Sequence, residues 1–435
     1  MDKAVSILGR QPALGLAELE SLYGAEVVSV VAPGVTGLAL DAPEVNFARL
    51  GGSTRLATVL GEVSSTDFKH VEKSLISFVK STAFALPDEG KFHLGLSAYG
   101  FTITPAKLNA LGLTLKKVIR KRHNGSVRLV PNNAAELSTA QVYHNHLAND
   151  QGAELLLIKT TGEKTIIART VAVQDIDSYT LRDRGRPQRD ARVGMLPPKL
   201  AQIIVNMATA SHRPLSEITV LDPFCGTGVL LQEALLMGCR AYGTDLEPRM
   251  IAYSTANLDW LSKTYGLQPE RYKLSQGDAT SHEWNLADDQ TEASGRTHTA
   301  NRRQPAYTVA CETYLGRPFT EAPARAVLEQ TVSEVNTIVK KFLANIHPQL
   351  APGTRLCLAV PAWYTGANWS EATSQKQSAD RRLPPVTAFR RLPLLEQLGS
   401  LGFKRINFQH APQEQLIYYR EGQLVGRELV TLTRE

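Results

Sequence analysis

The sequence has few cysteines and no long apolar run. Its four cysteines, in 435 residues, include no C-x-x-C pair and have no histidine at metal-ligand spacing. Disulfides and a metal centre are therefore not expected. The N-terminus lacks the apolar core of a signal peptide, and nowhere do about 18 apolar residues run together, so no secretory or membrane-spanning segment is predicted. We expect a cytoplasmic protein with no membrane partner.

A glycine turn in the second half lacks one glycine of the dinucleotide fingerprint. The β-branched run Ile218 to Leu221 predicts a buried strand, and Gly226 and Gly228 predict a tight turn that opens a helix. A G-x-G-x-x-G motif would need a third glycine, but position 231 is Leu. This absence disfavours a dinucleotide.

Acids near the turn favour a different adenosine-containing ligand. Asp222 precedes the glycines, where it would repel a pyrophosphate but could hold an ammonium group. Asp245 ends the next apolar run, about 20 residues on, where an acid can accept from ribose hydroxyls. Asp278 follows the third expected strand and could accept from an adenine amine, although a plain turn acid is an alternative. The pattern favours S-adenosylmethionine.

The segment from Lys107 to Arg128 contains no acid. Apolar residues recur in it at helical spacing, so we predict a helix with one positive, solvated face. Such a face can be functionless, but the absence of carboxylates and a net charge of +6 favour a nucleic acid partner equally well. A second, arginine-rich segment from Tyr179 to Arg192 suits phosphate contacts. The candidate RNA-binding residues are Lys116, Lys117, Arg120, Lys121, Arg122, Arg128, Arg182, Arg186 and Arg189.

The chain is too long for one ordinary core, and its pattern suggests three parts. Residues 1–65 read as β-α-β-β, typical of a ferredoxin-like segment. Residues 66–173 hold the basic segment, and residues 174–435 begin with a linker and then alternate strands with helices, which predicts a parallel, doubly wound sheet. Within this last part, residues 287–305 read as a flexible insertion, and residues 415–433 as a hairpin that adds an antiparallel edge.

The chain resembles the tRNA guanosine-10 N2-methyltransferases, a family that joins a ferredoxin-like segment and a THUMP domain to a class I methyltransferase fold. The resemblance rests on residues 7–12, 126–128, 182–190 and 194–200, on the glycine turn at 222–228, and on residues 418–420 and 425–428. It implies an α/β fold with a Rossmann-like methyltransferase domain, S-adenosylmethionine as cofactor and tRNA as partner. It leaves open a small activating subunit; otherwise we expect a monomer. The implied cofactor-binding residues are Pro197, Asp222, Phe224, Gly226, Thr227, Gly228, Asp245, Leu246, Asp278 and Ala279.

The chain departs from this family at the acceptor motif, which lacks both prolines. Where the family has Asp or Asn, two prolines and an aromatic residue, the sequence reads Cys311-Glu312-Thr313-Tyr314-Leu315. A base amine becomes nucleophilic only when oxygens hold its hydrogens, and an aromatic ring must stack on the flipped base. Glu312 can supply the oxygen and Tyr314 the ring, so both are the candidate catalytic residues. Alternatives are an amino-methyltransferase of other base specificity on DNA or RNA, and an inactive RNA-binding homologue.

Overall fold

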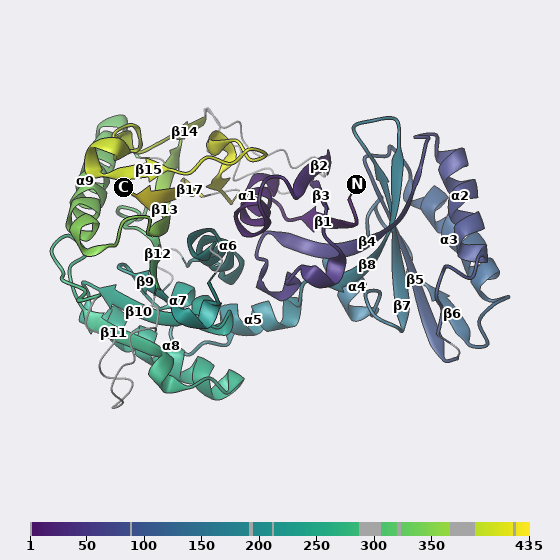
Figure 1. Cartoon of the computed structure of the whole chain (residues 1–435), viewed down its shortest axis with the longest axis horizontal. Coiled ribbons are helices and arrows are strands. Elements are labelled where there is room, and N and C mark those ends of the chain that lie inside the picture. Colours follow the sequence, from purple (N-terminus) through teal and green to yellow (C-terminus); the bar gives the residue numbers. More distant parts are fainter. Residues whose placement is uncertain are drawn as a thin grey trace. The chain divides into compact units, whose positions relative to one another are not determined.

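Strands from the whole first part of the chain pair in one sheet. The computed structural model describes residues 2–87, 89–190, 195–210, 213–286, 306–319, 323–365, 388–420 and 423–435 (Figure 1). Its backbone forms two compact units, Met1–Thr180 and Leu181–Glu435. The predicted insertion at 287–305 lies outside the described residues. Within the described ranges, no helix is long and apolar enough to cross a membrane.

The first unit is an eight-stranded mixed sheet in the order β2-β3-β1-β4-β8-β7-β5-β6. Among its described strands, only β5 with β6 and β5 with β7 pair in parallel. The expected β-α-β-β order is present, and β4 is a long strand that the sequence pattern did not reveal. The elements are β1 (Ala4–Leu8), α1 (Pro12–Tyr23), β2 (Val28–Ala32), β3 (Val35–Leu38), β4 (Ser53–Val63), α2 (Phe68–Lys80), β5 (Lys91–Tyr99), α3 (Pro105–Ile119), β6 (Ser126–Leu129), α4 (Thr139–His144), β7 (Gly152–Lys159) and β8 (Thr165–Val173). The helix α5 (Ile176–Arg184) begins in the first unit and ends in the second.

The sheet runs through both domains predicted for residues 1–173. β4 belongs to the predicted ferredoxin-like segment, and it pairs with β1 on one side and with β8 of the predicted THUMP-like domain on the other. The helices α2 and α3 pack side by side on one face of the sheet (Figure 1). Val71 and Leu75 of α2 and Leu111 of α3 are buried in the core of this unit. The assignment of 1–65 and 66–173 to separate domain types stays a prediction.

A buried ion pair joins these two segments. Arg55 of β4 donates from Nη1 to Glu154 Oε1 of β7 at 2.9 Å, and both side chains are almost fully buried. Ser97 and Thr170 also donate to the Glu154 carboxylate, each at 2.6 Å. The hydroxyl oxygen of Tyr99 accepts from Arg55 at 2.6 Å. Arg55 is the cation of this network, so the buried charge of Glu154 is uncompensated when Arg55 is removed.

We expect Arg55→Met to destabilise the first unit by about 3–5 kcal/mol, because it leaves Glu154 buried without its cation. All four tryptophans lie in the second unit, so hydrogen exchange of the β7 amides is the measurement of choice. Lys3→Met is the control, because Lys3 pairs with Asp41 in a solvent-exposed ion pair, and it should leave the exchange rates unchanged. Equal protection of β7 in Arg55→Met and parent would contradict this prediction.

The second unit contains a nine-stranded sheet. Seven strands follow the order β11-β10-β9-β12-β13-β17-β15, and off this path β14 pairs with β13 and β16 with β17. The strands from β11 to β13 are parallel, which confirms the predicted doubly wound arrangement. The elements are α6 (Pro198–Thr209), β9 (Ile218–Asp222), α7 (Val229–Leu236), β10 (Arg240–Asp245), α8 (Pro248–Tyr265), β11 (Tyr272–Gln276), β12 (Ala306–Glu312), α9 (Arg325–Ile346), β13 (Arg355–Tyr364), β14 (Phe389–Arg390), β15 (Phe403–Arg405), β16 (Ile417–Tyr418) and β17 (Val425–Arg434).

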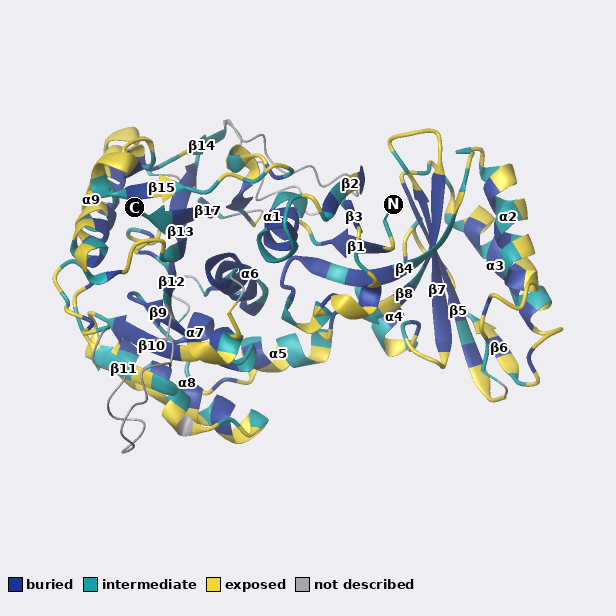
Figure 2. Ribbon diagram, in the orientation of Figure 1, coloured by how far each residue is buried: buried dark blue, intermediate teal, exposed yellow. Residues whose placement is uncertain are grey.

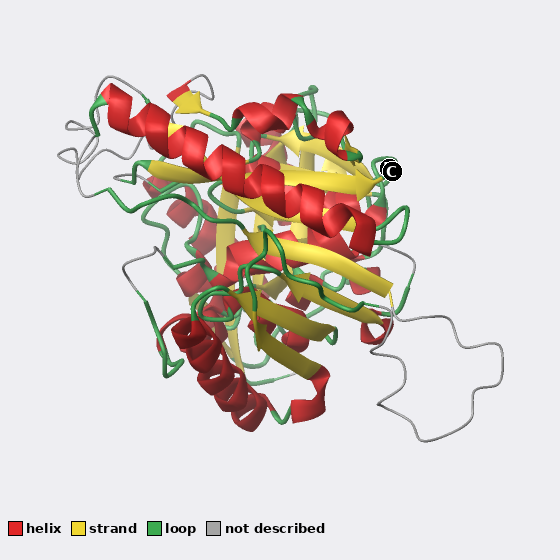
Figure 3. Cartoon of the chain, turned by 90° about the vertical axis from the view of Figure 1, so that its left-hand side faces the viewer, coloured by secondary structure: helices red, strands yellow, loops and turns green. Residues whose placement is uncertain are grey.

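Helices cover both faces of this sheet. α9, the long helix nearest the viewer in Figure 3, packs its apolar face on the side of Leu221 and Tyr242. The other face carries Ala241 beneath α7 and α8. Because side chains alternate along a strand, the neighbours Ala241 and Tyr242 serve opposite layers. Figure 2 shows the result, dark buried strands between helices whose outer faces are exposed.

The predicted C-terminal hairpin is present but does not form the sheet edge. β16 pairs antiparallel with β17, as expected. However, β17 lies between β13 and β15, so it is an inner strand. Its residues from Gly426 to Leu432 are buried, as expected for a strand with partners on both sides. The short strand β15 is the edge instead.

Candidate active site

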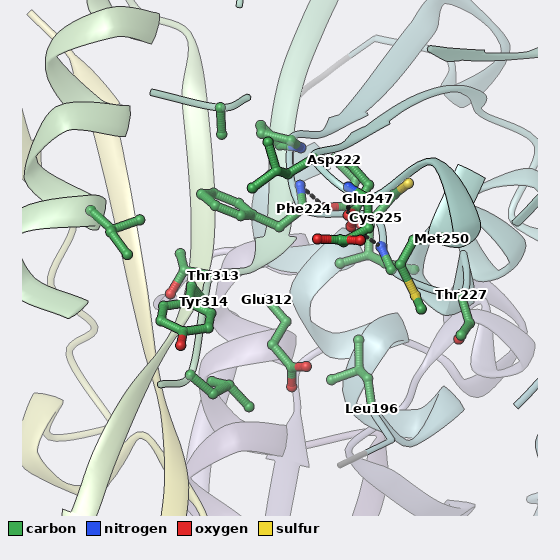
Figure 4. Close-up of a pocket in the computed structure, with 18 of the residues that line it drawn as sticks. Leu196, Asp222, Phe224, Cys225, Thr227, Glu247, Met250, Glu312, Thr313 and Tyr314 are labelled. Carbon is green, nitrogen blue, oxygen red and sulfur yellow. Dashed lines mark hydrogen bonds between the residues drawn. The ribbon is translucent and has the colours of Figure 1, made fainter. Parts of the chain in front are cut away.

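The parallel strands of the second unit end at a pocket of about 790 Å³ (Figure 4). Most of the predicted site residues lie around it. These are Asp222, Phe224, Gly226, Thr227, Asp245, Leu246, Asp278, Ala279, Glu312 and Tyr314. Two predicted cofactor residues are not among those that line it: Pro197 is the N-cap of α6, and Gly228 is the N-cap of α7. Their role in cofactor binding stays a prediction.

The glycine turn has the strand-turn-helix geometry that the sequence predicts. Gly226 and Gly228 have φ values of +53° and +79°, in the left-handed region that glycine favours. At Gly228 an added Cβ would also lie 3.0 Å from the Ser254 hydroxyl oxygen. That hydroxyl donates to the Gly226 carbonyl at 2.7 Å. The turn is therefore fixed by α8 as well as by its own glycines.

Asp245 fastens the end of β10 to the same turn. Its Oδ2 accepts from the Gly226 amide and its Oδ1 from the Glu247 amide, both at 2.9 Å. Partial burial raises the pKa of Asp245, and these two donors oppose that rise. The sequence predicts this acid at the end of the strand, and the structure shows that it also organises the loop. Its bond to ribose stays a prediction.

The pocket is strongly acidic. Asp222 is 2% exposed, and among the described residues its carboxylate accepts one hydrogen bond, from the Phe224 amide at 3.1 Å. Burial raises the pKa of Asp222 well above its ordinary value, and the nearby Asp245 and Glu312 raise it further. The acids that line the pocket are Asp190, Asp222, Asp245, Glu247, Asp278, Glu312 and Glu334, against two bases, Arg249 and Lys341. Such a pocket suits a ligand with positive charge and disfavours a pyrophosphate.

One helical face of α9 lines the pocket, and the sequence analysis missed it. Glu334, Thr337, Ile338 and Lys341 have the spacing i, i+3, i+4, i+7. That periodicity was visible in the sequence, but nothing in it showed that the face meets the glycine turn.

Asp278 also lines the pocket. Its pKa is lowered mainly by the Thr280 amide and hydroxyl, which donate to it, and Lys341 lowers it to a smaller extent.

Glu312 is the last residue of β12 rather than a loop residue beyond it. Its Oε1 accepts from Arg427 Nε at 2.6 Å. Burial raises the pKa of Glu312, while Arg427 lowers it. Figure 4 shows the Glu312 side chain on the same side of the pocket as Tyr314 and pointing away from Asp222. Sequence reasoning did not connect Arg427 with Glu312, because the two are 115 positions apart.

The aromatic residues near the ends of β12 and β13 differ in their exposure. Tyr314 is 40% exposed and lines the pocket, so its ring is available to a ligand. Trp363 and Tyr364 are the last two residues of β13, and they are not among the residues that line the pocket. Trp363 is fully buried in the core, and the Tyr364 ring packs on Phe389.

Two of the predicted phosphate-binding arginines are buried. Arg182 is 7% exposed, and its Nε donates to Glu233 Oε1 at 2.7 Å. Arg186 is 2% exposed. A buried guanidinium cannot meet a phosphate at the surface, so the interpretation of these two residues as RNA contacts was wrong for this conformation. Arg189 is exposed. Arg192, also noted in the arginine-rich segment, lies outside the described residues.

The basic segment of the first unit is a helix only in part. α3 ends at Ile119, a turn follows, and Arg128 lies on β6. Beyond the helix, His123 is buried, and Gly125 lies so close to the Gly90 carbonyl that an added Cβ would clash. Arg122 donates to the carbonyls of Val79 and Phe84. The exposed members are Lys117, Arg120, Lys121, Arg122 and Arg128, and Lys116 is half-buried.

Comparison with known proteins points to one class of enzyme. Residues 186–304 match the family model of the RMKL-like methyltransferase domain. The tRNA (guanine(10)-N2)-dimethyltransferase of Pyrococcus abyssi is 28% identical over 177 residues, 39% of this chain and 50% of that protein. The protein of the same name from Methanocaldococcus jannaschii is 32% identical over 117 residues, which are 27% of this chain and 31% of that protein. The chain thus spans half or less of the length of these relatives.

Among solved structures, TrmN from Thermus thermophilus aligns over 99% of both chains, with 16% identity and a TM-score of 0.46. The sequence matches confirm the predicted resemblance. They also agree with the pocket, whose buried, uncompensated Asp222 and excess of acids suit the cationic methyl donor S-adenosylmethionine. Residues 186–304 are therefore similar to the RMKL-like methyltransferase domain, and the chain is related in sequence to the tRNA (guanine(10)-N2)-dimethyltransferases.

Proposed function

We propose that the protein transfers a methyl group from S-adenosylmethionine to the exocyclic N2 amine of a guanosine in tRNA, in the cytoplasm. One observation carries the proposal: the acidic pocket at the glycine turn also contains Glu312 and the exposed ring of Tyr314. A cofactor site and a carboxylate suited to an amine thus share one cavity. The relatives named above support tRNA as the substrate.

The residues of the pocket divide the work between cofactor and acceptor. S-adenosylmethionine, when bound, supplies an electrophilic methyl group. Asp222 and Asp245 would hold its ammonium and ribose groups, and Asp278 its adenine amine. Tyr314 would stack on the acceptor base, while Glu312 accepts a hydrogen bond from the base amine and orients its lone pair toward the cofactor. The proton of the amine leaves after the new N–C bond has formed, so no strong base is required.

The chemistry of Glu312 favours guanine over adenine. An ionised carboxylate only accepts hydrogen bonds. The edge of guanine that carries N2 presents two neighbouring donors, N1–H and the amine, whereas adenine presents an amine beside the acceptor N1. A carboxylate therefore matches the guanine edge and is repelled by the adenine N1. This argues against the alternative of an adenine-specific DNA enzyme.

We expect the exposed basic side chains of the first unit to bind tRNA. Replacing Lys117, Arg120 and Lys121 together by Ala should weaken tRNA binding. It should also reduce the slope of log K against log salt by about 2–3, at ~0.7–0.9 for each phosphate that these side chains neutralise. Filter binding at several salt concentrations measures both. The control is a triple variant in which three exposed basic residues of the second unit, Arg240, Lys263 and Lys404, are replaced by Ala.

The same assay separates the competing functions. Tight, salt-sensitive binding of tRNA over duplex DNA, with methyl transfer, supports the proposal. Duplex DNA held as tightly as tRNA at physiological salt would favour a DNA enzyme. Binding of tRNA and cofactor with no transfer would favour an inactive homologue, a candidate because the acceptor motif at Glu312 to Leu315 lacks the family's prolines.

A further inference from the structure

The candidate catalytic carboxylate has one partner in the described part of the chain. Arg427 Nε donates to Glu312 Oε1 at 2.6 Å, and the side chains are 5% and 16% exposed, respectively. Among the described residues no hydrogen bond is found at the other oxygen, Oε2, and Glu312 lines the pocket. One oxygen of Glu312 is therefore fixed, and the other is left for a ligand in the pocket.

The sheet register explains how a distant arginine reaches this carboxylate. Glu312 on β12 lies opposite Ala359 on β13, and Ala359 lies opposite Leu429 on β17. Arg427 is two residues from Leu429, so it lies on the same face of the sheet as Glu312. Its side chain spans the width of β13. The next residue, Glu428, is directed to the opposite face.

We propose that Arg427 is a positioning residue, which holds Glu312 by Oε1 so that Oε2 meets the amine of the acceptor base. The inference rests on the proposed function. Glu312 is one methylene longer than the Asp or Asn of the family that the chain resembles, and the extra bond adds rotational freedom that must be lost before the amine can be oriented. A buried, charge-assisted hydrogen bond removes that freedom in advance.

Arg427 also favours the ionised form of the carboxylate. Burial raises the pKa of Glu312, and Arg427 is the cation that opposes this rise. Without Arg427, the pKa of Glu312 should rise further. A protonated Glu312 would present a donor to an amine that needs an acceptor.

The test compares Arg427→Met with the parent in steady-state methyl transfer. We expect kcat to fall by about 100-fold, the cost of a misplacement of ~1 Å, while KM for tRNA and Kd for S-adenosylhomocysteine stay unchanged. Arg427→Lys should recover part of kcat, because it restores the cation without the guanidinium geometry. Arg405→Met is the matched control: Arg405 pairs with Glu428 at 2.9 Å, on the opposite face of β17. It should keep the parental kcat.

A second measurement does not depend on activity. The Glu312 carboxyl can be titrated by ¹³C NMR in protein labelled at glutamate Cδ, with Glu312→Gln to assign the signal. We expect a higher titration midpoint in Arg427→Met than in the parent. If the parent transfers no methyl group to tRNA, the proposed function fails and this titration alone decides the role of Arg427.

Three results would overturn the proposal. The first is a parental kcat in Arg427→Met. The second is an unchanged titration midpoint of Glu312. The third is a loss of kcat that Arg405→Met shares equally, since that would assign both arginines to the stability of the sheet.

Discussion

Replacing Glu312 by Ala should abolish methyl transfer, with kcat lower by about 100-fold or more, while cofactor and tRNA binding persist. The lone pair of a base amine is drawn into the ring, so the amine attacks only when an acceptor holds its hydrogens. Ala removes that acceptor. Binding should survive, because the proposed contacts to the cofactor and to tRNA are made by other residues, the acids around the glycine turn and the basic side chains of the first unit. Single-turnover kinetics with saturating tRNA measures the effect.

Glu312→Gln is the matched control, since it keeps length and an acceptor oxygen but loses the charge. Partial activity in Glu312→Gln and none in Glu312→Ala would show that orientation of the amine dominates over charge.

The parent should lose activity as pH falls through the pKa of Glu312, because the carboxylate is the acceptor. Burial raises this pKa, so the loss should begin at a higher pH than for an exposed glutamate. Full activity of Glu312→Ala would place the acceptor site elsewhere.

Asp245→Ala should weaken S-adenosylhomocysteine binding by roughly 10- to 150-fold, the loss of charge-assisted hydrogen bonds worth ~1.5–3 kcal/mol. Two effects combine, because Asp245 is predicted to bind ribose and also accepts from the Gly226 and Glu247 amides. Calorimetry measures the affinity. Asp259→Ala removes an exposed acid of α8 and should change nothing. An Asp245→Ala variant with parental affinity would exclude Asp245 from the cofactor site.

Local features of the fold were predictable from the sequence. The strand, turn and helix around Gly226 follow from β-branched residues and glycines that are neighbours in the chain. The position of Asp245 at a strand end follows in the same way. The helix boundary at Ile119 was not predicted, because the basic and apolar residues of the sequence continue at helical spacing beyond it.

Long-range pairing was the part that the sequence could not reveal. Charge alone suggested that Arg182 and Arg186 face a phosphate, but burial is set by tertiary packing, and Arg182 neutralises Glu233, 51 positions away. In the same way, nothing near Glu312 in the sequence indicates Arg427, because strand order decides that β17 lies next to β13. A pattern identifies candidates for chemistry, and the sheet determines which of them meet.

The identity of the methylated nucleoside tests the proposed reaction itself. The full-length protein is incubated with S-adenosylmethionine labelled in its methyl group and with bulk unmodified tRNA, which is then digested to nucleosides and separated. We predict label in N2-methylated guanosine, and none when Glu312→Ala replaces the parent. Label in adenosine or cytidine, or a parent that binds cofactor and tRNA without any transfer, would contradict the proposed reaction.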